Sequence, residues 1–147
     1  MGVVPALIRP VLRVGAVVIR HNTVLLVKCA DGPKRGFWSI PVTAMVVGES
    51  LPQILERYIA ETTGMVVEGG CPVYSEDSIE RDDQGKVVDH QTTIFLAARY
   101  ISGNPVAGGG AEEVAWVSVE AMEFMEIDEA ALLLLEALSF LELEDEA

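Results

Sequence analysis

Lysine and arginine are missing from the last third of this sequence. All ten basic residues lie at or before Arg99, where they nearly balance eleven acidic residues, whereas twelve acidic residues follow Arg99. The formal net charge is −13. An acidic C-terminal region repels phosphate backbones, so the composition argues against a nucleic-acid partner. We interpret the region as a solvated face that ends in an acidic tail at about residues 142–147.

Long apolar runs and cysteines are also scarce. The longest apolar stretches, such as 14–19 and 132–135, are far too short to span a bilayer. The N-terminus has no basic segment ahead of a long apolar core, so it does not read as a secretory signal. Cys29 and Cys71 are too few for a disulfide framework or a tetrahedral zinc site, although a single bridge between them stays open. We therefore expect a cytoplasmic protein with no membrane partner.

What is present favours one globular domain. Half of the 147 residues are hydrophobic, and no linker or internal repeat divides the chain. We assign residues 1–147 to a single domain, with an N-terminal extension at about 1–12. Apolar runs and turn residues predict a hairpin, a helix, a second hairpin, another strand and a final helix, in that order. Their predicted ranges are 14–19 and 24–28, 51–63, 73–79 and 91–100, 114–117, and 129–141.

The helix at 51–63 carries the clearest local signals. Ser50 is a good N-cap, Gln53 completes a capping box, and Pro52 lies in the first turn, where proline is tolerated. Gly64 suits the C-cap. With strands on both sides of this helix, a mixed β-sheet sandwiched between helices, an α/β (α+β) architecture, is the economical fold.

The segment from Trp38 to Val67 resembles the Nudix box of the Nudix (MutT-like) hydrolase superfamily. That box reads G, five residues, E, seven residues, then R-E-U-x-E-E-x-G-U, where U is a bulky aliphatic residue. The chain matches it at six positions and departs from it at three. The matches are Glu49, Arg57, Ile59, Glu61, Gly64 and Met65. The departures are Thr43 for the glycine and Tyr58 and Thr62 for two glutamates, and the preceding Gly-Gly turn is replaced by Val42-Thr43.

The departures matter because of the chemistry that the resemblance implies. Members of the superfamily hydrolyse nucleoside diphosphates linked to another group, and a divalent metal neutralises the pyrophosphate and activates water. Positions 58, 61 and 62 lie on one helix face, where three carboxylates would bind Mg²⁺. Here that face offers Tyr58, Glu61 and Thr62. Glu56 cannot substitute, because it lies roughly 200° around the helix from position 58.

The resemblance implies a reduced set of site residues. We expect Glu49, Arg57 and Glu61 to be the catalytic residues, with Glu61 as the main metal ligand and Glu49 as a second ligand or base. Arg57 pairs with the acid equivalent to Glu49 in the family. We also name Arg81 and Glu113 as candidates for substrate binding. Each has a plainer interpretation: Arg57 and Glu61 as a surface ion pair, Arg81 and Glu113 as solvated loop residues, and Tyr58 and Thr62 as helix core.

Two functions remain open on these residues. The first is a divergent, weak hydrolase of a nucleoside diphosphate derivative that needs Mg²⁺ or Mn²⁺. The alternative is a catalytically inactive Nudix-fold module that binds a nucleotide or another protein. The segment 75–91 loosely resembles the corresponding hairpin of ADP-ribose pyrophosphatase-like members. Apolar segments at 3–12 and 132–143 suggest a possible homodimer.

Overall fold

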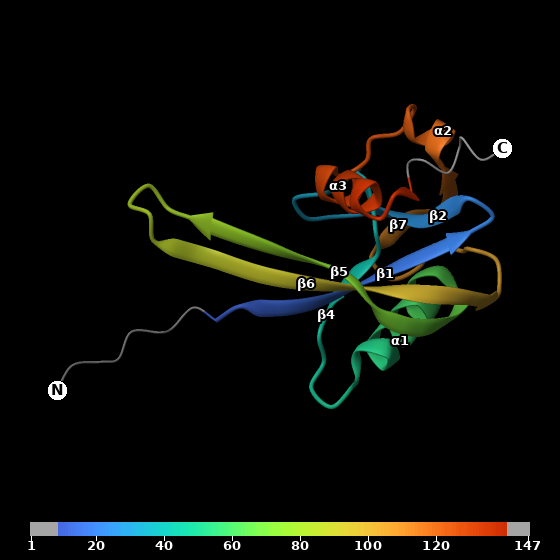
Figure 1. Ribbon diagram of the computed structural model, residues 1–147, viewed down its shortest axis with the longest axis horizontal. Helices are drawn as coiled ribbons and strands as arrows, with labels where there is room; N and C mark the ends of the chain where they lie inside the picture. Colours follow the sequence, from blue (N-terminus) through green and yellow to red (C-terminus); the bar gives the residue numbers. More distant parts are fainter. Residues whose placement is uncertain (1–8, 141–147) are drawn as a thin grey trace.

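The computed structural model describes residues 9–140 as seven strands and three helices around one mixed sheet (Figure 1). The predicted acidic tail and most of the predicted N-terminal extension lie outside the described residues. The elements, in chain order, are β1 (Val11–Arg20), β2 (Thr23–Cys29), β3 (Trp38–Ser39), β4 (Val42–Ala44), α1 (Leu51–Thr63), β5 (Val66–Arg81), β6 (Val87–Ser102), β7 (Ala111–Ser118), α2 (Val119–Met122) and α3 (Glu129–Ala137).

Strand β1 organises the sheet, because both of its edges are paired. One edge runs parallel to β6 from Val11 to Val18, and β6 pairs in turn with β5. The other edge pairs first with β4, over 13–15, and then with β2, over 19–20. Strand β2 continues into pairings with β3 and β7. The sheet therefore forks along β1, and one branch (β1, β4, β6, β5) diverges from the other (β2, β3, β7).

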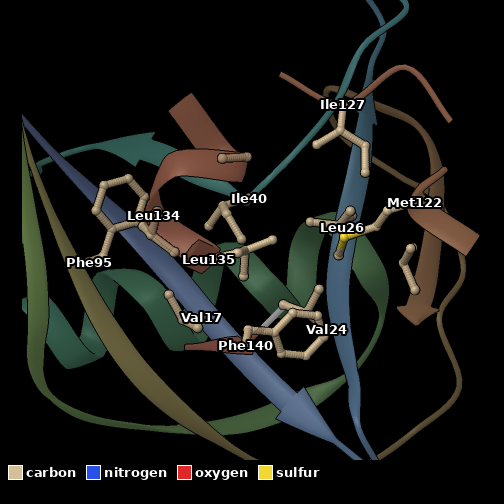
Figure 2. Close-up of a cluster of buried hydrophobic side chains, with 12 residues drawn as sticks. Val17, Val24, Leu26, Ile40, Phe95, Met122, Ile127, Leu134, Leu135 and Phe140 are labelled. Atoms are coloured by element: carbon tan, nitrogen blue, oxygen red, sulfur yellow. The ribbon is translucent and has the colours of Figure 1, made fainter. Parts of the chain in front are cut away.

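The middle of β1, residues 14–18, is buried on both faces of the sheet. Its side chains alternate between the two faces, and a helix packs against each face. Val14, Ala16 and Val18 pack with Ile54, Leu55 and Ile59 of α1. Val17, on the opposite face, packs with Leu134 and Leu135 of α3, as Figure 2 shows. Figure 1 shows α1 and α3 on opposite sides of β1. This arrangement confirms the predicted mixed sheet sandwiched between helices.

The predicted helix α1 is confirmed residue for residue. The Ser50 side chain accepts a hydrogen bond from the Gln53 backbone N–H at 3.3 Å, and the Gln53 side chain accepts one from the Ser50 backbone N–H at 2.9 Å. Gly64 ends the helix in the left-handed region, at φ 75°, which favours glycine. These caps fix where the helix starts and stops, and hence which side chains of the box share a face.

Other elements differ from the prediction in length. Strands β5 and β6 are sixteen residues each, and their hairpin extends well away from the rest of the fold (Figure 1). The sequence predicts a last helix over 129–141, but α3 ends at Ala137, Ser139 takes φ 60°, and Phe140 turns into the core with 1% of its surface exposed. The short helix α2 has no counterpart in the prediction.

The possible homodimer stays a prediction. It is suggested by the apolar segments 3–12 and 132–143. In their described parts, the exposed fractions of Val11, Leu12 and Leu133 are 47%, 44% and 55%. Residues 1–8 and 141–147 lie outside the described residues. Within 9–140, no helix combines the length and apolar character needed to cross a membrane.

Candidate active site

The three charged residues retained from the box form one ion-pair cluster that extends from just before α1 to its last turn. Arg57 donates from Nη2 to Glu49 Oε1 at 2.8 Å and from Nε to Glu49 Oε2 at 3.1 Å, a two-point contact. The same guanidinium donates from Nη1 to Glu61 Oε1 at 3.3 Å, one helical turn along. The structure therefore brings Glu49, Arg57 and Glu61 together, with Arg57 between the two carboxylates.

Hydrogen bonds from Arg57 hold the pKa of Glu49 below its usual range, and the same bonds, with those to Glu61, raise the pKa of Arg57. Both carboxylates are partly exposed, so the pairs contribute modestly to stability. The arrangement anchors the residues before α1 to the helix. It also leaves Glu49 and Glu61 sharing one cation of the chain itself, so the cluster keeps one net negative charge.

Replacing Arg57 by methionine should raise the pKa of Glu49 towards the ordinary glutamate value, because the donors that stabilise its anion are lost. Since the folded-state pKa is depressed in the wild type, the pair stabilises the fold above the unfolded-state pKa and stops doing so as pH falls through the folded-state pKa. Carbon-13 NMR titration of the Glu49 carboxyl measures the shift. Urea unfolding should show the difference from wild type shrinking at acidic pH.

The matched control is Arg99→Met, which breaks an exposed pair to Glu68 at 3.4 Å on another element. It should leave the titration of Glu49 unchanged. An unchanged Glu49 titration in Arg57→Met would contradict the assignment of the cause to Arg57.

The helix face that would hold a metal is largely neutral. Burial raises the pKa of Tyr58, against smaller lowering effects of the Thr62 hydroxyl and the Arg13 charge, so the phenol is uncharged near neutral pH. Thr62 is 2% exposed. Glu56 points elsewhere and accepts a hydrogen bond from the Gly69 backbone N–H at 2.9 Å. No group of three His, Cys, Asp or Glu residues within 9–140 is arranged to hold a metal. These residues do not fit a tight Mg²⁺ site.

The two predicted substrate-binding residues make their hydrogen bond and ion pair outside this cluster. Arg81 ends β5 on the projecting hairpin and donates to the Gly85 carbonyl at 3.0 Å. Glu113, on β7, pairs with Lys28 at 3.3 Å and has a side chain that is 56% exposed. Both contacts are local to their own strand pair, and neither residue forms a hydrogen bond or ion pair with Glu49, Arg57 or Glu61.

A cleft of about 540 Å³ opens where the two branches of the sheet diverge. Tyr58 lines it from α1, Arg13 from β1, and Asp128 from the start of α3. Its floor includes Phe95, whose ring lies over Gly15: a Cβ at Gly15 would come within 2.4 Å of that ring. Pockets that take nucleotide-sized ligands have volumes in this range, roughly 300–1,000 Å³. The cleft is therefore the candidate ligand site, and Tyr58 connects it to the box helix.

Sequence reasoning missed the polar residues that β1 and β6 contribute to the cleft, chiefly Arg13 and Gln91. The sequence does carry a signal for Arg13. It lies four residues before the buried Val17 in the same strand, so the two side chains are on the same face of the sheet. The predicted strand begins at Val14, one residue after Arg13, so the prediction does not place Arg13 on a strand face. Gln91 carries no comparable signal, because its role depends on the pairing of β1 with β6.

Comparison with known proteins agrees with this fold. No family model matches the chain. An ADP-ribose pyrophosphatase from Methanocaldococcus jannaschii is 26% identical over 128 residues, which cover 86% of this chain and 72% of that protein. The MutT NUDIX hydrolase of Burkholderia pseudomallei superposes with a TM-score of 0.74 at 23% identity, covering 87% and 97% of the two chains. The NUDIX domain of Shewanella oneidensis NrtR, solved with ADP ribose, gives 0.66 at 25% identity, covering 87% and 85%.

The fold and the box helix thus define a protein of the Nudix fold class. More particularly, the chain is similar to Nudix (MutT-like) hydrolases and to an ADP-ribose pyrophosphatase. This similarity confirms the resemblance that the box residues indicate.

Proposed function

We propose that this chain binds a nucleoside diphosphate derivative, with ADP-ribose as the reference compound, in the cleft beside Tyr58, and that hydrolysis is a minor activity. The observation that carries the proposal is a cleft large enough for such a ligand, lined by Tyr58 of α1. Tyr58 is uncharged, and it occupies a position where the family has a metal-binding glutamate. The ligand class is suggested by the similarity to an ADP-ribose pyrophosphatase and to an ADP-ribose complex. A fold alone does not confer turnover, because the site residues do.

The charge balance of the box supports binding over catalysis. Metal-assisted hydrolysis needs several carboxylate oxygens that are free to bind a divalent cation. Glu49 and Glu61 are the two acids retained, and both are already paired with Arg57, which leaves one net negative charge. A metal would have to compete with that guanidinium for the same oxygens.

The divergent hydrolase remains the second candidate, and the retained Glu49–Arg57–Glu61 cluster favours it. If the chain does hydrolyse its ligand, Mg²⁺ or Mn²⁺ at Glu61 and Glu49 would supply the charge neutralisation, at a weak site. The control for this candidate is Glu61→Gln, which removes a carboxylate while keeping the size of the side chain.

One set of measurements separates the two candidates. Calorimetric titration of ADP-ribose tests binding, and release of phosphate-bearing products with Mg²⁺, with Mn²⁺ and with EDTA tests turnover. We expect saturable binding and product release close to background. Metal-dependent turnover that Glu61→Gln abolishes would establish the hydrolase instead. A folded protein that binds none of a panel of nucleoside diphosphate derivatives would overturn the proposal.

A further inference from the structure

The cleft floor on the long-hairpin side is a polar platform built from three adjacent strands. In the register of the sheet, Arg13 of β1 lies beside Thr93 of β6, and Thr93 lies beside Glu76 of β5. One step outward, Gln91 of β6 lies beside Ser78 of β5. All five of these residues line the cleft. Pairing of strands far apart in the sequence thus gathers them on one face.

Arg13 has an unusual hydrogen-bonding state within this platform. Its Nη1 donates to the Gln91 side-chain oxygen at 3.3 Å, and the Gln91 amide donates in turn to Asp89 at 3.4 Å. Its Nε is fully buried and has no hydrogen-bond partner among the described residues. A buried donor left unpaired is destabilising, and one on a charged group more so. Such an atom beside a cleft indicates an acceptor that arrives with a ligand.

The geometry of the guanidinium selects the kind of acceptor. Gln91 accepts from Nη1, so the edge formed by Nε and Nη2 is the one left for a ligand. That edge presents two parallel N–H donors, which match two oxygens of a phosphate or carboxylate. No ion pair of the described residues involves Arg13, whereas Lys34, the other basic residue of the cleft, is paired with Asp128 at 3.0 Å.

The neighbouring acids restrict the ligand further. Glu76 lies two strands from Arg13, and strands are spaced by about 4.8 Å, so the backbones of the two residues are roughly 10 Å apart across the platform. Asp31 lines the cleft as well. Carboxylates repel a second free anion but accept hydrogen bonds from hydroxyl groups. The cleft suits a ligand with an oxyanion at one end and hydroxyl groups at the other, as in a sugar phosphate.

We propose that Arg13 is the anchor of a metal-independent anion site, in which its Nε–Nη2 edge binds a phosphate of the nucleoside diphosphate ligand and Gln91 positions the guanidinium. This inference rests on the proposed function for the identity of the whole ligand, but the anion site itself does not. Tyr58 contributes by being neutral: a glutamate at that position would face the same cleft and pair with Arg13. The chain's own cation then performs the neutralisation that the family assigns to a metal.

The test compares the wild type, Arg13→Gln and the charge-matched control Arg99→Gln by calorimetry in EDTA. Two probes are used, ADP-ribose and inorganic pyrophosphate. Loss of a two-point contact to a charged group should weaken binding about 10- to 100-fold in Arg13→Gln. Arg99 pairs with Glu68 on an exposed surface, so Arg99→Gln should bind like the wild type. Adding Mg²⁺ should change the wild-type affinity little.

A second readout separates binding from a structural role. Without ligand, Arg13→Gln should melt no lower than the wild type, because the variant removes a buried unpaired donor. Arg13→Lys keeps the charge but lacks the two parallel N–H donors of arginine. Its affinity should therefore lie between those of Arg13→Gln and the wild type. A lowered melting temperature with unchanged affinity in the folded fraction would assign Arg13 to the fold and overturn the inference.

The outcomes distinguish this inference from the proposed function. ADP-ribose binding that is equal in the wild type and Arg13→Gln, or that requires Mg²⁺, overturns the anion site and leaves the proposed function standing. Arg13-dependent binding of pyrophosphate without binding of ADP-ribose supports the anion site and overturns the proposed ligand. Binding of neither probe by the folded wild type overturns both.

Discussion

Replacing Tyr58 and Thr62 together by glutamate should strengthen Mg²⁺ binding by about 10- to 100-fold, because the affinity of oxygen sites for divalent cations rises with the number of carboxylates. The two new acids and Glu61 would lie on one face of α1 at helical spacings of three, four and one. Calorimetric titration with Mg²⁺ measures the change. The family resemblance places the metal at this face, so the variant tests the register of the box as well.

The same variant should be less stable than the wild type without metal. Thr62 is 2% exposed and Tyr58 is largely buried, so carboxylates at these positions lose solvation, at a cost of about 1–3 kcal/mol each unless paired. Mg²⁺ should restore part of this loss by binding the folded state alone. The matched control carries glutamine at both positions. It keeps the size and polarity but adds no charge, and it should gain no Mg²⁺ affinity.

If the glutamate variant binds Mg²⁺ no better than the glutamine variant, the helix face at 58, 61 and 62 is not a latent metal site. Arg13 lines the same cleft and would offer a competing partner for the acid at position 58. Repeating the titration in the Arg13→Gln background removes that competitor. A gain confined to this background would identify Arg13 as the cause.

Replacing Phe140 by alanine should lower the free energy of unfolding by about 3–5 kcal/mol, the range for a fully buried phenylalanine. Phe140 is 1% exposed and packs with Val17, Val24 and Leu135 in the cluster under α3 (Figure 2). Its loss leaves a cavity that the short helix α3 cannot close. Urea unfolding followed by circular dichroism gives the free energy directly.

The control for this prediction is Leu133→Ala on α3 itself. Leu133 is 55% exposed, so its truncation removes little buried surface and should change stability by less than about 1 kcal/mol. Comparable losses for the two variants would contradict the inward turn of the chain after α3. They would favour instead the continuous helix over 129–141 that the sequence predicts.

Where a structural feature depends on neighbours in the chain, the sequence was sufficient to predict it. Ser50, Gln53 and Gly64 define both ends of α1, because caps act within four residues of the helix terminus. The resemblance to the Nudix box implies the pair between Arg57 and Glu49 that the structure forms at 2.8 Å. The first hairpin follows from two β-branched runs around Asn22, which takes φ 60° in the turn.

Where a feature depends on which strands meet, the sequence was insufficient. The alternation at Arg13 gives its face of the sheet but not the identity of its neighbours. Those come from the parallel pairing of β1 with β6, across a separation of about eighty residues. The length of the β5–β6 hairpin has the same origin, since its outer half has few apolar residues and pairs by backbone hydrogen bonds.

The sequence alone determined the fold class, the position of the box helix and the residues Tyr58, Glu61 and Thr62 that share one of its faces, because each of these depends on residue type at a fixed spacing along the chain. Only the tertiary structure decided that Phe140 enters the core and that Tyr58, Arg13 and Gln91 line one cleft. The physical reason is that a cleft exists where two branches of a sheet diverge. Strand pairing between distant segments, rather than the order of residues, sets which side chains face it.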